Sequence, residues 1–208
     1  MNMKHTHESG RSMIEMLGVL AIIGVLSVGG IQGYSMAMSK FKVSKTTDQV
    51  QTMVTNVRTL FAGNRTYDGL GDTTSGYGTT YTLGIFNDEI CDDKTCKNPV
   101  NPYGGSVSIG TANKKQYFTI SYSGLPQDAC TRLAMADWGD ASSGLVAIIA
   151  SGAAATAQTN ATSFTANAAT GIFTTTAHLI PISLSNAVTA CKLTASADNS
   201  SSITWIYR

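Results

Sequence analysis

The chain has 208 residues and a formal net charge of +1, from 14 Lys and Arg against 13 Asp and Glu. Nucleic-acid binding requires a dense basic face, so this balance predicts no specific nucleic-acid partner. Charged residues make up 13% of the chain and hydrophobic residues 43%, a composition that excludes extensive disorder. The expectation is a folded protein of one domain, with or without a tail.

The most informative segment is an apolar run near the N-terminus. Residues 16–39 contain no charged side chain. As a helix this run would extend about 36 Å, enough to cross a hydrocarbon core of about 30 Å. A membrane anchor, a secretory signal peptide and a helix of a bundle interior all fit this composition. Glu15 disfavours the signal peptide, because a carboxylate at the start of an apolar helix is costly in lipid unless it has a partner.

A family motif surrounds the start of this run. The segment GRSMIEM at residues 10–16, followed by AIIGVLS at residues 21–27, resembles the class III signal of type IV prepilins. The resemblance implies a leader, residues 1–10, which a membrane-embedded prepilin peptidase removes by cleavage between Gly10 and Arg11. It also implies N-methylation of the new terminus, although Arg11 stands where the family usually has an apolar residue.

Glu15 matches the fifth position after the cleavage site. The resemblance implies that Glu15 of an incoming subunit pairs with the terminal amine of a neighbour and so sets the axial register of a fibre. Pairing would remove most of the cost of a carboxylate in hydrocarbon. The alternative interpretation is an acid that the macrodipole favours at a helix N-terminus.

The helical pattern continues past the apolar run. A stripe with steps of three and four residues predicts an amphipathic helix over residues 40–62. Its members are Val43, Thr47, Val50, Val54, Val57 and Phe61. Joined to a hydrophobic transmembrane or filament-core segment at residues 11–39, this pattern predicts one helix over residues 12–62.

Residues 63–208 have the composition of a globular head with an αβ-loop. Alternating or β-rich stretches predict four strands, at residues 80–85, 106–109, 116–122 and 202–207. The fold class is therefore α+β, with a long N-terminal α-helix packed on a C-terminal antiparallel β-sheet head. The resemblance names this arrangement the pilin fold.

Other parts of the head are expected to be helical or irregular. Helices are predicted within residues 124–139 and 183–191, and Ser183 or Ser185 would cap the second. Residues 144–149 fit a strand or a helix. The polar stretch 64–80 is expected to be an exposed loop, and residues 151–177 are expected to be exposed loops or weak edge strands.

Four cysteines lie in the head, and they allow three pairings. We favour Cys91–Cys96 together with Cys130–Cys191, since an even count on the exported side is typical of disulfides. In type IV pilins a C-terminal disulfide bounds a variable D-region, and residues 130–191 resemble it. Zinc is a poor alternative, because the C-x4-C spacing fits no common structural zinc motif. No metal and no cofactor are expected.

Signals for enzymatic activity are weak. The sequence contains none of the common nucleotide-binding or hydrolase motifs. An acidic cluster lacks the spacing of an EF-hand and predicts a solvated turn. Its members are Asp88, Glu89, Asp92 and Asp93. We predict that the protein is not an enzyme; a membrane-tethered secreted enzyme that uses His178 or the acidic cluster is a distant alternative.

The resemblance implies a structural subunit of a type IV pilus. Such a subunit polymerises into a helical, homopolymeric extracellular fibre for adhesion, aggregation, motility, DNA uptake or conjugation. Its partners would be the prepilin peptidase, the pilus assembly machinery, and a host or neighbouring-cell surface. It would lie in the inner membrane of a Gram-negative bacterium before assembly. A minor pilin or a type II secretion pseudopilin is the alternative within the same superfamily.

Overall fold

The structure is a computed structural model that describes residues 9–71, 76–153, 164–193 and 200–208. The chain divides into two units, Met1–Phe41 and Lys42–Arg208. Helix α1 (Ser9–Leu60) supplies the described part of the first unit and enters the second. It begins three residues earlier and ends two residues earlier than the sequence pattern predicts.

Helix α1 is long because nothing in its sequence interrupts it. The first proline of the chain is Pro99. Five threonines in the second half of α1 donate their hydroxyl hydrogen bonds to carbonyls one turn earlier, which satisfies these polar groups within the helix. They are Thr46, Thr47, Thr52, Thr55 and Thr59. The helix therefore accommodates hydroxyl residues without exposing unsatisfied donors.

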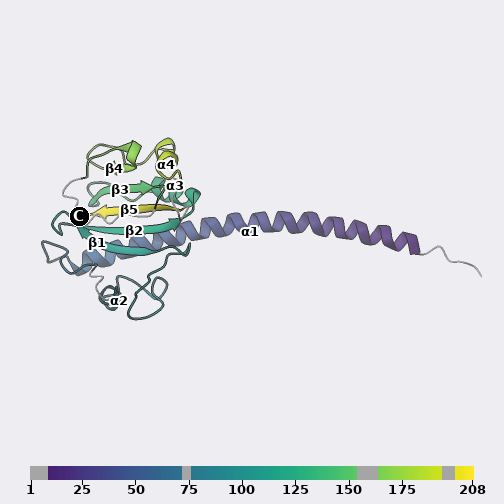
Figure 1. The fold of residues 1–208 in the computed structure, drawn as a ribbon, viewed down its shortest axis with the longest axis horizontal. Helices are drawn as coiled ribbons and strands as arrows, with labels where there is room; N and C mark the ends of the chain where they lie inside the picture. The colour runs from purple at the N-terminus through teal and green to yellow at the C-terminus, as the bar shows by residue number, and fades with distance from the viewer. Residues whose placement is uncertain (1–8, 72–75, 154–163, 194–199) are drawn as a thin grey trace, which may run out of the picture. The chain divides into compact units, whose positions relative to one another are not determined.

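The second unit is built on a five-stranded antiparallel sheet in the order β1-β2-β5-β3-β4 (Figure 1). The strands are β1 (Val107–Ala112), β2 (Tyr117–Leu125), β3 (Leu145–Ser151), β4 (Ile172–Thr174) and β5 (Ser201–Tyr207). The C-terminal strand β5 occupies the centre, and every residue in it is buried. The predicted strands at 106–109, 116–122 and 202–207 correspond to β1, β2 and β5, and residues 144–149 belong to β3.

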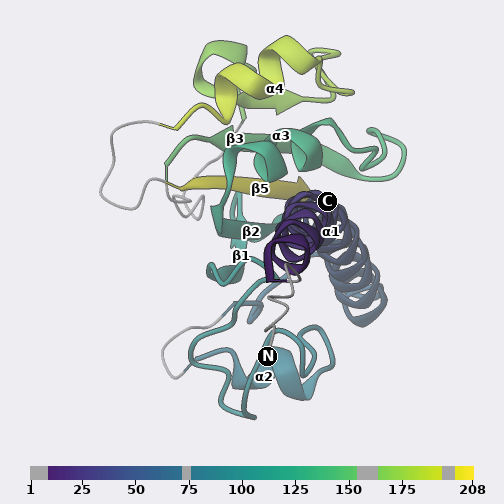
Figure 2. The same ribbon diagram turned by 90° about the vertical axis from the view of Figure 1, so that its right-hand side faces the viewer.

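Short helices border this sheet. They are α2 (Gly78–Thr82), α3 (Gln127–Met135), the 3₁₀ turn η1 (Ala168–Thr170) and α4 (Leu184–Ala190). In both views α4 lies towards the β4 edge and α2 lies beyond the β1 edge (Figures 1 and 2). The two predicted helices are present as α3 and α4, and the Ser183 side chain caps α4 by accepting a hydrogen bond from the N–H of Asn186.

The predicted strand at residues 80–85 is wrong. Residues 78–82 form α2, and Gly84 adopts a left-handed conformation with φ of +73° directly after it. Tyr81 uses its backbone N–H to bond the carbonyl of Tyr77, one helical turn back. Alternating Thr, Tyr and Leu residues favour a strand only where a neighbouring strand pairs with them, and here the chain turns instead.

The stretch 151–177, expected to form exposed loops or weak edge strands, contains an edge strand that is more buried than expected. Within residues 151–177, Ile172–Thr174 form the edge strand β4, and the Phe173 side chain is fully buried. Residues 154–163 of that stretch lie outside the described part of the chain. The low charge and many small residues of this stretch gave no indication of a core contact. The buried Phe173 side chain nevertheless packs the short strand β4 into the core.

The core lies between the sheet and the second half of α1. Val50, Met53, Val54 and Val57 of α1 are buried, close to the predicted stripe. The largest fully buried side chains of the unit include Trp205, Tyr122, Phe86, Phe118 and Phe173. Trp205 packs edge-on against Tyr122 and at 4.6 Å from Trp138, ring centre to ring centre. Such aromatic packing adds stabilisation beyond area burial.

Both outer strands of the sheet have backbone partners on their outer sides. Beside β4, Asn167 forms a two-bond bridge with Ile172, and the N–H of Leu179 bonds the carbonyl of Thr174. Beside β1, the N–H of Val107 bonds the carbonyl of Pro99. These contacts occupy some of the backbone groups that the two edges would otherwise present.

Gly71 approaches the β1 edge too closely for any side chain. A Cβ added to Gly71 would lie 2.3 Å from the carbonyl oxygen of Ile109, and Gly71 has a φ of +77°. Only glycine fits both the conformation and the distance. The loop after α1 therefore lies directly against the outer strand.

Candidate functional site

The first half of α1 is apolar on all sides. In the stretch of residues 13–36 every side chain is exposed; for example, Ile14 is 73% and Val25 is 75% exposed. Within the described residues, this is the one helix that is long and apolar enough to cross a membrane, with a mean hydropathy of 2.2 in its most apolar window. A helix with no polar face belongs in lipid or among other helices.

The residues predicted to direct processing lie at the start of this helix. Gly10 and Arg11 belong to the first turn of α1. The Arg11 side chain and leader residues 1–8 lie outside the described part of the chain. Glu15 is exposed, one turn further on. The cleavage site and the pairing role of Glu15 stay predictions.

The head is fastened by two disulfides. Cys130 in α3 is bonded to Cys191 at the end of α4, with 5.9 Å between their Cα atoms, and both residues are fully buried. This confirms the expected C-terminal disulfide. The structure also joins Cys91 to Cys96, with 5.0 Å between Cα atoms. The first bond ties α3 to α4, and the second closes a small loop of the segment after α2.

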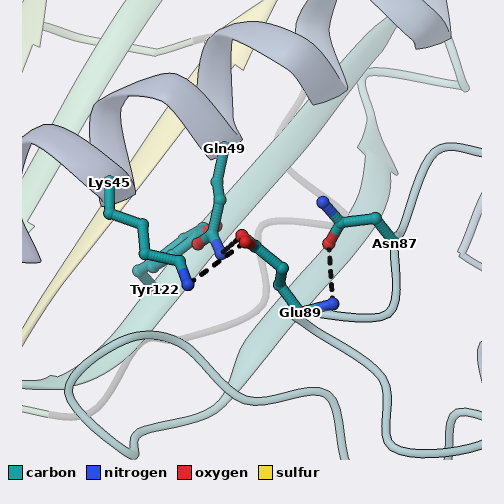
Figure 3. A network of polar contacts seen from close by, with 5 residues as sticks. All are labelled: Lys45, Gln49, Asn87, Glu89 and Tyr122. Atoms are coloured by element: carbon teal, nitrogen blue, oxygen red, sulfur yellow. Dashed lines mark hydrogen bonds and ion pairs between the residues drawn. The ribbon is translucent and has the colours of Figure 1, made fainter.

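A polar network holds this loop segment against α1 and the sheet (Figure 3). The Gln49 side chain, only 6% exposed, donates a 3.2 Å hydrogen bond from Nε2 to Glu89 Oε2. Its Oε1 accepts a 3.2 Å hydrogen bond from the hydroxyl of Tyr122 on β2. Lys45 Nζ lies 3.3 Å from Glu89 Oε1. One amide therefore links three parts of the head.

The surroundings of Glu89 and Tyr122 shift the pKa values of both groups. The hydrogen bond from Gln49, followed by that from Lys45, lowers the pKa of Glu89 below its ordinary value. Burial raises the pKa of Tyr122, so its hydroxyl remains a donor at any physiological pH. The backbone N–H of Glu89 also bonds the side-chain oxygen of Asn87, which fixes the start of the turn.

The acidic cluster is structural. Asp93 accepts hydrogen bonds from the N–H groups of Thr95 and Cys96, and Asp88 accepts one from the hydroxyl of Tyr81. No group of metal-ligating side chains occurs among the described residues. His178 is exposed in a turn, with a φ of +54°.

The sequence analysis did not identify the network. Gln49 lies among the buried residues of α1, and a polar side chain within an apolar stripe is the signal that could have revealed it. Its two partners, Glu89 and Tyr122, are 40 and 73 positions away in the sequence. No local pattern connects positions so far apart.

Comparison with known proteins identifies the family. The model of the Bundlin family matches residues 36–208, most of the chain. The chain belongs to the Bundlin family. Two curated relatives, from Escherichia coli O111:H- and from E. coli O127:H6 strain E2348/69, are each 29% identical over 202 residues, covering 94% of both chains. Both are described as the major structural subunit of bundle-forming pilus.

A solved structure supports the fold independently. The crystal structure of TcpA, a type IV pilin from the Vibrio cholerae El Tor biotype, matches with a TM-score of 0.58 and 17% sequence identity. The match covers 80% of this chain and 99% of that chain. The Bundlin-family chain thus has the fold of a type IV pilin. Membership of the type IV pilins, expected from the sequence, is confirmed, while the matching family model begins at residue 36, after the motif at residues 10–27.

Proposed function

We propose that this chain is the major structural subunit of a type IV pilus and polymerises into an extracellular fibre. The observation that carries the proposal is the helix of α1, exposed and apolar on all sides, in a chain of the Bundlin family. The curated relatives have the same role in bundle-forming pili. A structural subunit needs no catalytic centre.

Assembly would begin in the inner membrane of a Gram-negative bacterium. The prepilin peptidase would cut between Gly10 and Arg11, and the assembly machinery would transfer the helix from lipid into a bundle of like helices. Lipid and helix bundle are equally apolar, so the transfer has little hydrophobic driving force of its own. Close packing and the pairing of Glu15 with a neighbour's terminal amine would supply the difference.

The proposal is tested on protein sheared from the cell surface. N-terminal sequencing is expected to start at Arg11, and the intact mass to reveal whether that residue is methylated. High abundance in the sheared fibres would support a major rather than a minor pilin. A start near Gly30 would indicate signal-peptidase export instead, and an intact Met1 on protein that stays in the membrane would contradict fibre assembly.

A further inference from the structure

A polar hollow of about 340 Å³ lies where the loop after α1 meets the turn between β1 and β2. Six residues from three separate segments line it: Asn64, Arg65, Tyr67, Gln116, Tyr117 and Arg208. The hollow belongs to the second unit alone and is remote in sequence from the residues proposed for processing and assembly.

Every one of these six side chains can donate hydrogen bonds, and none is acidic. Arg65 and Arg208 form no ion pair within the described residues. The Oε1 atom of Gln116 already accepts a 3.0 Å hydrogen bond from Asn113, which leaves its N–H groups as the free part of the amide. Burial raises the pKa of Tyr67, while Arg58 and Arg208 act in the opposite direction, so the hydroxyl stays protonated at neutral pH.

Contacts outside the hollow hold its walls in place. The Tyr67 ring packs edge-on against the Phe118 ring, with 4.9 Å between the ring centres. The backbone N–H of Tyr67 donates a hydrogen bond to the carbonyl of Lys115. The N–H of Arg208 bonds the carbonyl of Gly144. The neighbouring acid, Asp68, is ion-paired with Lys115 and is therefore neutralised.

The turn that delivers Gln116 and Tyr117 is strained. Three consecutive residues adopt left-handed conformations: Asn113, Lys114 and Lys115, with φ of 48°, 53° and 67°. Residues other than glycine rarely adopt the left-handed region, and such backbone strain is frequent in ligand-binding loops.

We propose that this hollow binds a tetrahedral oxyanion, a phosphate or sulfate group, between the guanidinium groups of Arg65 and Arg208. Guanidinium groups donate in a planar fork that matches two oxygens of such an anion. The remaining oxygens face the hydroxyl and amide donors of the other walls. A planar carboxylate has too few oxygens to use donors arriving from three segments.

The test uses the full chain in a nonionic detergent with arginine side chains labelled for NMR. Inorganic phosphate is titrated at constant ionic strength, because screening alone weakens exposed charges. The N–H signals of Arg65 and Arg208 are expected to shift together and to saturate with one dissociation constant. The N–H signal of Arg132 on α3, which lies outside the hollow, is expected to show no saturable shift with phosphate.

Three further probes define the ligand class. Sulfate is expected to behave as phosphate does, and acetate to bind at least tenfold more weakly. Glucose 6-phosphate distinguishes the source: tighter binding than inorganic phosphate indicates an ester carried on a surface glycan, and equal binding indicates the free ion. Acetate binding as tightly as phosphate would overturn the assignment to a tetrahedral anion.

Matched variants decide whether the hollow is responsible. Arg65→Gln is expected to weaken phosphate binding about tenfold, the usual effect of losing a hydrogen bond between charged groups. Arg132→Gln makes the same charge change elsewhere and should leave the affinity unchanged. Arg65 is exposed, so its variant should keep the wild-type spectrum at distant residues. The proposal would be overturned if the N–H signals of all three arginines shifted linearly and in parallel with phosphate concentration. It would also be overturned if both variants weakened phosphate binding equally.

Discussion

Gln49 shows how much depends on a single polar side chain in an apolar interface. It accepts a hydrogen bond from the buried Tyr122 hydroxyl and donates one to Glu89. A buried group that loses its partner costs about 1–3 kcal/mol, more than the bond itself contributes. The network is therefore a point at which one substitution would loosen both the sheet contact and the loop.

We expect Gln49→Leu to lower the free energy of unfolding by about 1–3 kcal/mol, because it leaves the Tyr122 hydroxyl buried without an acceptor. Denaturation of the full chain in nonionic detergent measures the effect. Gln51→Leu, an exposed position on the same helix, is the control. Adding Tyr122→Phe to Gln49→Leu should restore part of the loss, and a loss no larger than that of the control would refute the role of the network.

Glu89 makes the stability of the head depend on pH. Its pKa is lowered in the folded state, so its charged form contributes stability at neutral pH. That contribution is lost as the pH falls below about 4.5, the ordinary pKa of glutamate, and through the lower folded value. Glu89→Gln is expected to flatten this part of the pH profile of the denaturation midpoint. Asp92→Asn, the same kind of change on the same loop, should leave the pH profile of the denaturation midpoint as in the wild type. Identical profiles for the two variants would contradict the stabilising role of the Glu89 charge.

At the scale of elements, sequence patterns predicted what is local. The three- and four-residue steps predicted α1 to within a few residues, and alternation located β1, β2 and β5. The strand at 80–85 failed because Thr, Tyr and Leu favour strands only beside a partner. The central place of β5, the last strand in the chain, depends on pairing with β2 and β3 over more than 50 residues. No periodicity encodes such pairing.

The functional residues also differ in whether a local sequence pattern could reveal them. Gly10, Arg11 and Glu15, the residues proposed for cleavage and register, were predicted from a contiguous motif, and the apolar helix was predicted from an uncharged run of residues. The Cys130–Cys191 pairing followed the family resemblance and is confirmed. The polar network and the donor-lined hollow combine side chains from separate segments, so only the folded chain brings them together.

The two disulfides should contribute unequally. In the chain-entropy model the Cys130–Cys191 bond, with a separation of 61 residues, contributes about 4 kcal/mol, whereas the Cys91–Cys96 bond, with a separation of 5, contributes about 2 kcal/mol. We expect the paired alanine replacement of Cys130 and Cys191 to lower the unfolding free energy by the larger amount. Denaturation of both double variants tests this, and equal or reversed losses would contradict the model.

At the scale of the whole molecule, the chain joins an apolar helix to a disulfide-fastened head in a family of pilus subunits. The proposed polymerisation requires the helix to leave lipid, and Glu15 is the acidic residue closest to the apolar run of residues 16–39. An acid at that point is stable in a fibre core only with a positive partner.

We therefore expect Glu15→Ala to be cleaved normally and to accumulate in the membrane without forming fibres. Immunoblotting of sheared and membrane fractions measures the distribution. Asp48→Ala removes an exposed acid from the same helix outside the apolar run, and should assemble as the wild type does. Abundant fibres from Glu15→Ala would disprove the register role.

The covered edges of the sheet bear on how such a fibre can grow. Chains that are exported in quantity and concentrated at one place are at risk of joining strand to strand, as amyloid does, at any time and without direction. Here the outer strands already hold backbone partners, and Gly71 lets the chain itself occupy the β1 border. In the proposed assembly, growth would then depend on the apolar helix rather than on pairing between strands.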